Sequence, residues 1–140
     1  MGLVLRQVVI DSTDARCSAA FWRQLMGLRY EAGHEPPAAG QDDPVAREWL
    51  NLRTPDGLPC LAIQPVSTMR PSTWPDDSVP QQLHLDLTVD DRQELDAVHA
   101  QVIEIGGTML RDDAADPDEP IKIYADPDGH PFCVWVPCAF

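Results

Sequence analysis

One short turn occurs twice in this chain, and this repetition limits the folds that the sequence can adopt. The turn Pro-Asp-Gly-x-Pro stands at 55–59 and again at 127–131, with its aspartates, Asp56 and Asp128, 72 positions apart. Proline restricts φ, aspartate bonds nearby backbone and glycine accepts positive φ, so each copy predicts a tight turn. A β-prone run follows each turn. Since the offset is about half of the 140 residues, it predicts a duplicated unit.

Each turn is preceded by the same series of predicted elements. An alternating strand at 3–11 is followed by a helical pattern that stops at Gly27, and a strand at 83–89 by one that stops at Gly106. Asp14 and Asp91 are good helix N-caps, and Glu94 completes a capping box. We therefore predict an α+β fold, with two βαβββ modules that form a curled mixed sheet in a single domain.

The module boundaries follow from composition. Module one is predicted at 1–66 and module two at 81–140, and both belong to one domain over 1–140. Residues 67–80 form the linker, because three prolines among small polar residues exclude regular structure there.

Charge and composition exclude several classes of partner. The formal net charge of −13 argues against nucleic acid and against an anionic membrane surface, since both need clustered Lys and Arg. Neither a bilayer-spanning apolar run nor a signal peptide is present, so we expect a cytoplasmic protein. Without CxxC spacing, the cysteines are predicted to be buried free thiols: Cys17, Cys60, Cys133 and Cys138.

The alternation in the first strands predicts a polar concave surface. Val8 and Ile10 should face the first helix, whereas Gln7, His84 and Asp86 should face away from the helices. Such a cup is the usual place for a small ligand. We expect alternate residues of the last strands and large aromatic side chains to line it. The predicted ligand-binding residues are Gln7, Trp49, Ile63, His84, Tyr124, Cys133 and Trp135.

His84 is the strongest chemical candidate. With Asp86 two residues on, it could act as a general acid or base or as a metal ligand; equally, it could be a hydrogen-bonded histidine of the cup wall. Cys133 could be a soft metal ligand, a nucleophile or a small apolar filler. His99 lies off the apolar stripe of the second helix and is predicted to be solvated.

Several motifs together resemble the glyoxalase/bleomycin-resistance/extradiol-dioxygenase (vicinal oxygen chelate) superfamily, and in particular its glyoxalase-like domain group. These motifs are Phe21-Trp22 with Leu25-x-Gly27, the run His84-Leu-Asp-Leu87, and Asp126-Pro-Asp-Gly-x-x-Phe-Cys133. The resemblance covers essentially the whole chain. It implies paired βαβββ modules and a homodimer.

The resemblance also implies metal ligands on the first and last strands of the modules. Those positions fall on Gln7, His84, Leu61 and Cys133, and leucine cannot bind a metal. If Zn, Ni, Mn or Fe binds, Gln7, His84 and Cys133 would hold it, without a carboxylate among them. This departure argues against a bound metal and against a standard glyoxalase.

The sequence leaves open whether the protein is an enzyme. One hypothesis is a metal-dependent lyase, isomerase or dioxygenase that acts on a small carbonyl or phenolic compound. The other is a metal-free binding protein like the drug-sequestering relatives, favoured by the lost ligand position and the aromatic residues.

Overall fold

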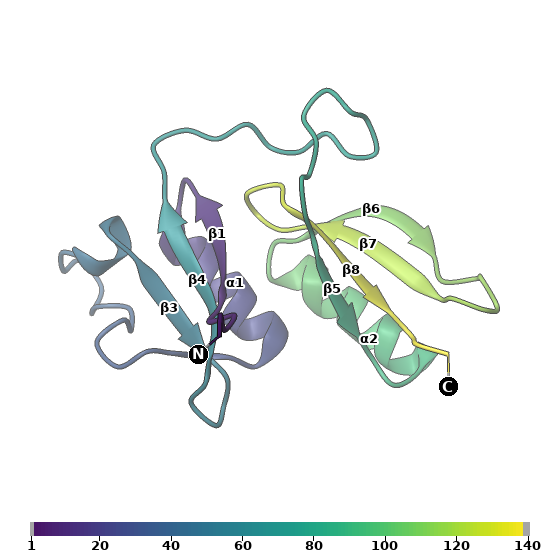
Figure 1. Cartoon of the computed structure of the whole chain (residues 1–140), viewed down its shortest axis with the longest axis horizontal. Coiled ribbons are helices and arrows are strands. Elements are labelled where there is room, and N and C mark those ends of the chain that lie inside the picture. Colours follow the sequence, from purple (N-terminus) through teal and green to yellow (C-terminus); the bar gives the residue numbers. More distant parts are fainter. Residues whose placement is uncertain (1, 139–140) are drawn as a thin grey trace. The chain divides into compact units, whose positions relative to one another are not determined.

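The computed structural model describes residues 2–138, which form two compact units that meet in sequence between Met69 and Arg70. Each unit contains one four-stranded mixed sheet and one long helix (Figure 1). This arrangement confirms the predicted α+β fold of two βαβββ modules.

The first unit has the strand order β1-β4-β3-β2. Its elements are β1 (Val8–Ser12), α1 (Ala15–Met26), β2 (Arg29–Tyr30), the 3-10 helix η1 (Val45–Arg47), β3 (Leu50–Arg53) and β4 (Pro59–Pro65). Strand β1 pairs with β4 in parallel, and the other pairs are antiparallel. Helix α1 packs on β1, β3 and β4.

The second unit repeats this order as β5-β8-β7-β6. Its elements are β5 (Leu85–Thr88), α2 (Arg92–Glu104), β6 (Thr108–Asp113), β7 (Ile121–Ala125) and β8 (Pro131–Trp135). Strands β5 and β8 are parallel, as β1 and β4 are. The same topology in both units explains why the turn motif occurs twice.

The helix boundaries agree with the predicted caps. The Asp14 carboxylate accepts a hydrogen bond from the Cys17 backbone N–H, and that of Asp91 accepts one from Glu94. The Glu94 side chain in turn accepts from the backbone N–H of Asp90. Gly27 ends α1 with φ of 63°, a conformation that favours glycine.

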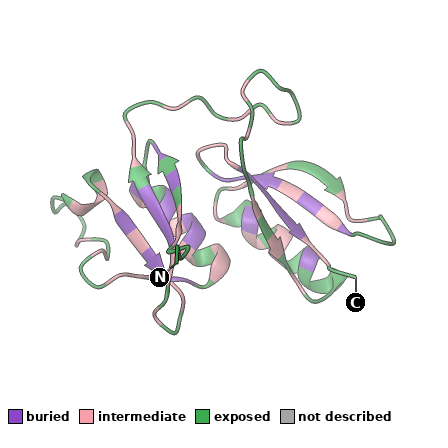
Figure 2. Cartoon of the chain, viewed as in Figure 1, coloured by how far each residue is buried: buried purple, intermediate pink, exposed green. Residues whose placement is uncertain are grey.

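The apolar core of each unit lies between its sheet and its helix (Figure 2). In the first unit the central pair is Phe21 and Trp22 of α1, each 1 % exposed, with their rings edge to face. In the second unit Leu95 and Val102 of α2 pack over the sheet and are buried. Neither helix has the length and apolar character needed to cross a bilayer.

The cysteines only partly match their prediction. None of the four forms a disulfide in the described part of the chain, and Cys133 is buried as predicted. Cys60 is half-buried, whereas Cys17 and Cys138 are exposed. Cys17 is exposed because it lies near the N-terminus of α1, on a side of the helix that faces solvent.

Candidate functional site

Three polar side chains come together on the helix-free face of the second sheet. Asp86 on β5 and Cys133 on β8 are register partners, and His84 precedes Asp86 by two residues, so alternation puts all three on one face. Nitrogen, carboxylate oxygen and sulfur donor atoms of the three residues all lie within 4.8 Å of one another. His84 and Asp86 are exposed and Cys133 is buried, so the cluster can be approached from solvent.

Apolar and aromatic side chains lie beside the cluster on this face. Ile123 of β7 pairs with Cys133, and Trp135 follows two residues later on β8. Farther along the same face, Arg111 and Asp113 of β6 form an ion pair. The indole Nε1 of Trp135 is buried without a hydrogen-bond partner among the described residues. An unsatisfied buried donor is uncommon and costs stability, which marks Trp135 as a candidate hydrogen-bond donor to a ligand.

The surroundings of Cys133 disfavour its thiolate. Burial raises the pKa of the Cys133 thiol, and the negative charges of Asp86 and Glu119 raise it further. A thiol that stays protonated at neutral pH is a poor nucleophile. A divalent cation would replace the proton and offset the repulsion from Asp86, so the arrangement suits metal ligation better than nucleophilic attack.

The cluster fits a small, borderline-soft divalent ion. Imidazole, carboxylate and thiolate are the three donor types found in zinc sites, and three protein ligands leave a fourth position open. Tetrahedral ligand atoms at zinc lie about 3.3–3.8 Å apart, given bond lengths of about 2.0–2.3 Å. The donor atoms lie within 4.8 Å of one another, so the most distant pair would approach by about 1–1.5 Å to reach that spacing. Asp86 thus supplies a carboxylate, which the ligand set implied by the resemblance lacked.

A β-bulge changes the expected equivalence in the first sheet. Leu52 pairs with Leu61 and Arg53 with Pro59, which leaves Cys60 unpaired between them. The extra residue shifts β4 by one position relative to β8. Ala62, which pairs with Val9 of β1, is therefore the counterpart of Cys133, and the expected counterpart, Leu61, is not.

The same shift corrects the prediction for Ile63. Leu61 and Ile63 were expected in the cup, but they pair with Leu52 and Leu50 on the face covered by α1. Ile63 is fully buried there, as are both leucines of β3. Alternation applied from the Pro-Asp-Gly turn gave the wrong face because it did not include the bulge at Cys60.

On the helix-free face of the first sheet, Asn51 connects Gln7 and Trp49. Its side-chain oxygen accepts hydrogen bonds from Trp49 Nε1 at 2.7 Å and from Gln7 Nε2 at 3.4 Å. Asn51 also donates to Glu31, which pairs with Arg53. The backbone N–H of Asn51 donates to Nδ1 of His34. Asn51 was not among the predicted site residues, although the alternation of Leu50-Asn51-Leu52-Arg53 places it on the open face.

Tyr124 lies on the opposite face from its predicted position. Its ring stacks on Phe132 and on His99 of α2, and its hydroxyl lies 3.2 Å from His99 Nδ1. Tyr124 is fully buried, so it belongs to the core beneath α2 and does not line the open face. His99, predicted to be solvated, is half-buried because it contacts this ring.

A family model described as "Glyoxalase-like domain" matches residues 7–135. The chain belongs to this family. The match spans both modules and includes His84, Asp86 and Cys133. No curated protein matches the sequence.

Solved structures of the same superfamily share the fold of this glyoxalase-like protein. A glyoxalase/bleomycin resistance protein from Albidiferax ferrireducens T118 is 18% identical, with 96% of this chain and 98% of that chain covered and a TM-score of 0.62. A glyoxalase/bleomycin resistance protein/dioxygenase family enzyme from Burkholderia phytofirmans PsJN is 14% identical, with coverage of 95% and 98% and a TM-score of 0.67.

A third neighbour is the fosfomycin resistance protein FosX from Listeria monocytogenes, solved as a mutant with Mn(II) and 1S,2S-dihydroxypropylphosphonic acid. It is 14% identical, with 99% of this chain and 95% of that chain covered and a TM-score of 0.68. At such identities these likenesses show the fold alone.

Proposed function

We propose that this glyoxalase-like protein binds a small molecule on the helix-free face of its second sheet, at a divalent ion held by His84, Asp86 and Cys133. The observation that carries the proposal is the mutual approach of their three donor atoms within 4.8 Å. A Listeria neighbour solved with Mn(II) is consistent with a metal on this fold. When bound, the ion would supply Lewis-acid polarisation of a ligand oxygen.

The chain's own residues would orient the ligand around that ion. Trp135 offers a flat apolar surface beside Cys133 and an unsatisfied N–H donor. Ile123 completes the apolar wall from β7. These features suit a ligand with one planar or apolar part and one oxygen-bearing part, such as the small carbonyl or phenolic compounds considered above.

Zinc binding to the chelator-treated protein tests the proposal. Isothermal titration calorimetry should show one Zn²⁺ site per chain, and Asp86→Asn or Cys133→Ser should weaken it by at least about ten-fold, since each removes an ionic ligand. Asp86 is exposed, so its variant should fold normally. The Cys138→Ser variant changes an exposed thiol of the same unit and should bind zinc as the wild type does.

A metal-free binding protein is the second candidate. The first sheet favours it, because Ala62, the counterpart of Cys133 on β4, has no atom that can bind a metal. Retained binding of an aromatic or carbonyl ligand in Asp86→Asn, with no zinc affinity in the wild type, would select this candidate and reject the metal site. A thermal-shift screen of such compounds measures it, because a ligand of the native state raises the melting temperature.

A further inference from the structure

A hollow lies within the first unit, and its lining does not include His84, Asp86 or Cys133. It has a volume of about 770 Å³ and is open to solvent. The C-terminal half of α1, the edge strand β2, the end of β3 and the turn at Gly57 form its walls. The lining residues are Arg23, Arg29, Tyr30, Glu31, Ala32, Glu35, Arg53 and Gly57.

The hollow concentrates positive charge in an acidic protein. Three of its lining residues are arginines, whereas the whole chain has 10 Lys and Arg against 23 Asp and Glu. Arg29 and Arg53 are direct register partners across β2 and β3. Like charges directly opposite one another in a sheet are destabilising, so such a pair calls for a compensating negative charge.

Glu31 compensates Arg53 but not the other two arginines. Its Oε1 accepts from Arg53 Nε at 3.0 Å and also from Arg53 Nη2, and its Oε2 accepts from Asn51 at 2.6 Å. The Arg53 bond and the Asn51 bond hold the pKa of the Glu31 carboxyl below its usual value. Glu31 is therefore ionised and already fully engaged.

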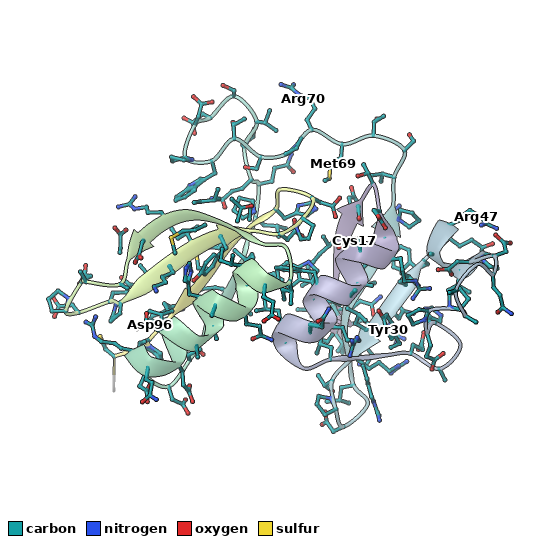
Figure 3. All side chains as sticks on the ribbon, turned by 180° about the vertical axis from the view of Figure 1, so that it is seen from behind. Cys17, Tyr30, Arg47, Met69, Arg70 and Asp96 are labelled. Carbon is teal, nitrogen blue, oxygen red and sulfur yellow. The ribbon has the colours of Figure 1, made fainter. Side chains whose placement is uncertain are left out.

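Arg23 and Arg29 have no comparable partner among the described residues. The guanidinium of Arg23, a residue of α1, lies 5.5 Å from the centre of the Tyr30 ring (Tyr30 is labelled in Figure 3). The Arg23 Nε is buried without a hydrogen-bond partner in the described part of the chain. Among the residues that the structure describes, the Arg29 side chain has no hydrogen bond or ion pair, and the charge of Asp56 lies nearby. Glu35, the other acid of the hollow, accepts from the Gly33 backbone.

We propose that this hollow binds a small oxyanion, a phosphate or carboxylate group, through the guanidiniums of Arg23 and Arg29. Guanidinium groups recognise both anions with paired, charge-assisted hydrogen bonds. The anion would supply the missing partner of Arg23 Nε and neutralise the charge that Arg29 places opposite Arg53. With a volume of about 770 Å³, the hollow is large enough for a small organic molecule that bears the phosphate or carboxylate group.

Calorimetric titration of inorganic phosphate into the whole protein at constant ionic strength tests the proposal. The wild type should bind one phosphate, and Arg29→Gln should weaken binding by about ten-fold or more, as expected for the loss of charged hydrogen bonds. Arg23→Gln should do the same. Arg29 is exposed, and its side chain makes no hydrogen bond to the described residues, so Arg29→Gln should keep the wild-type melting temperature. The Arg29 variant therefore tests the proposal even if the Arg23 variant does not fold.

Arg70→Gln is the matched control, because Arg70 is exposed, lies outside the hollow and loses the same charge. It should bind phosphate within about two-fold of the wild type, since screened charges outside the hollow contribute little. Equal weakening by Arg29→Gln and Arg70→Gln, or no phosphate binding by the wild type, would overturn the proposal. Titrations with phenyl phosphate and citrate then distinguish a phosphate ester from a carboxylate as the preferred oxyanion.

Discussion

Tyr124 shows how strongly the core beneath α2 constrains a single side chain. Its ring is stacked between Phe132 and His99, and its hydroxyl meets His99 Nδ1. Burial, with smaller contributions from the charges of Asp112 and Asp96, raises the pKa of the Tyr124 phenol far above its ordinary value. The neutral phenol is therefore the form that the fold stabilises.

This shift predicts how the protein behaves at alkaline pH. In a Tyr30→Phe variant, Tyr124 is the remaining tyrosine, and tyrosinate absorbance at 295 nm should stay absent at pH values just above 10 while the protein is folded. Because the native pKa is raised, the stability from Tyr124 is present below the unfolded pKa of about 10 and declines as pH rises above it. A tyrosinate signal near pH 10 with unchanged far-UV circular dichroism would contradict this assignment.

A second set of individual residues that can be tested is the cluster of His84, Asp86 and Cys133. Because its pKa is raised, the Cys133 thiol is a poor nucleophile. The expected role of Cys133 is therefore packing or metal ligation. The zinc titration of Cys133→Ser, described with that of Asp86→Asn, decides between these roles. If Cys133 only packs, the Cys133→Ser variant should bind zinc as the wild type does, or neither protein should bind zinc.

At the scale of elements, the duplicated turn has different neighbours in its two copies. Gly57 and Gly129 both have positive φ, of 92° and 89°. A Cβ on Gly129 would lie 2.6 Å from Pro71 Cβ, whereas one on Gly57 would meet only the flexible end of Arg29 at 3.1 Å. The segment through Pro71 therefore packs against the second turn, within the second unit.

This packing predicts a measurable difference between two glycine substitutions. Gly129→Ala combines unfavourable positive φ with a clash against Pro71, and it should lower the free energy of unfolding by about 2–4 kcal/mol. Gly33→Ala has a similar φ of 86° but open space around its Cβ, so it should cost only about 1–2 kcal/mol. Urea denaturation of both variants measures this difference, and equal losses would mean that Pro71 moves aside freely.

The bulge at Cys60 changes which side chains of β4 face the core. One unpaired residue transfers Leu61 and Ile63 to the core face and leaves Ala62 on the open face. The first sheet consequently has no ligand on its last strand, whereas the second sheet has Cys133. The two modules share a topology but differ in the chemistry of their open faces.

At the scale of the whole molecule, the proposed metal site predicts that zinc affinity depends on residues of the second unit. His84→Asn should weaken zinc binding by about ten-fold or more, because it removes a ligand, whereas Gln7→Ala should leave zinc binding unchanged. Calorimetric titration of both variants measures this difference, and equal weakening would contradict the assignment of the ligands to His84, Asp86 and Cys133. The homodimer implied by the resemblance remains a prediction.

Much of the architecture could be predicted from the sequence because it rests on local signals. The repeated turn, the alternation of the first strands and the caps at Asp14 and Asp91 are short-range features, and the structure confirms the elements that they predict. The pairing of His84 with Asp86 on one face also followed from alternation along a single strand. The placement of Cys133 beside them needed only the parallel pairing of β5 and β8.

Other features were decided by the tertiary structure, because they depend on interactions between elements. The register of β3 against β4 determines the bulge at Cys60 and hence the face occupied by Ile63. The packing of His99 against Tyr124 requires α2 to lie over β7, which no pattern within either segment reveals. The arginines of the hollow in the first unit likewise come together only because β2 pairs with β3 beside α1. Local sequence patterns determine which elements form, whereas long-range pairing and packing determine which side chains meet.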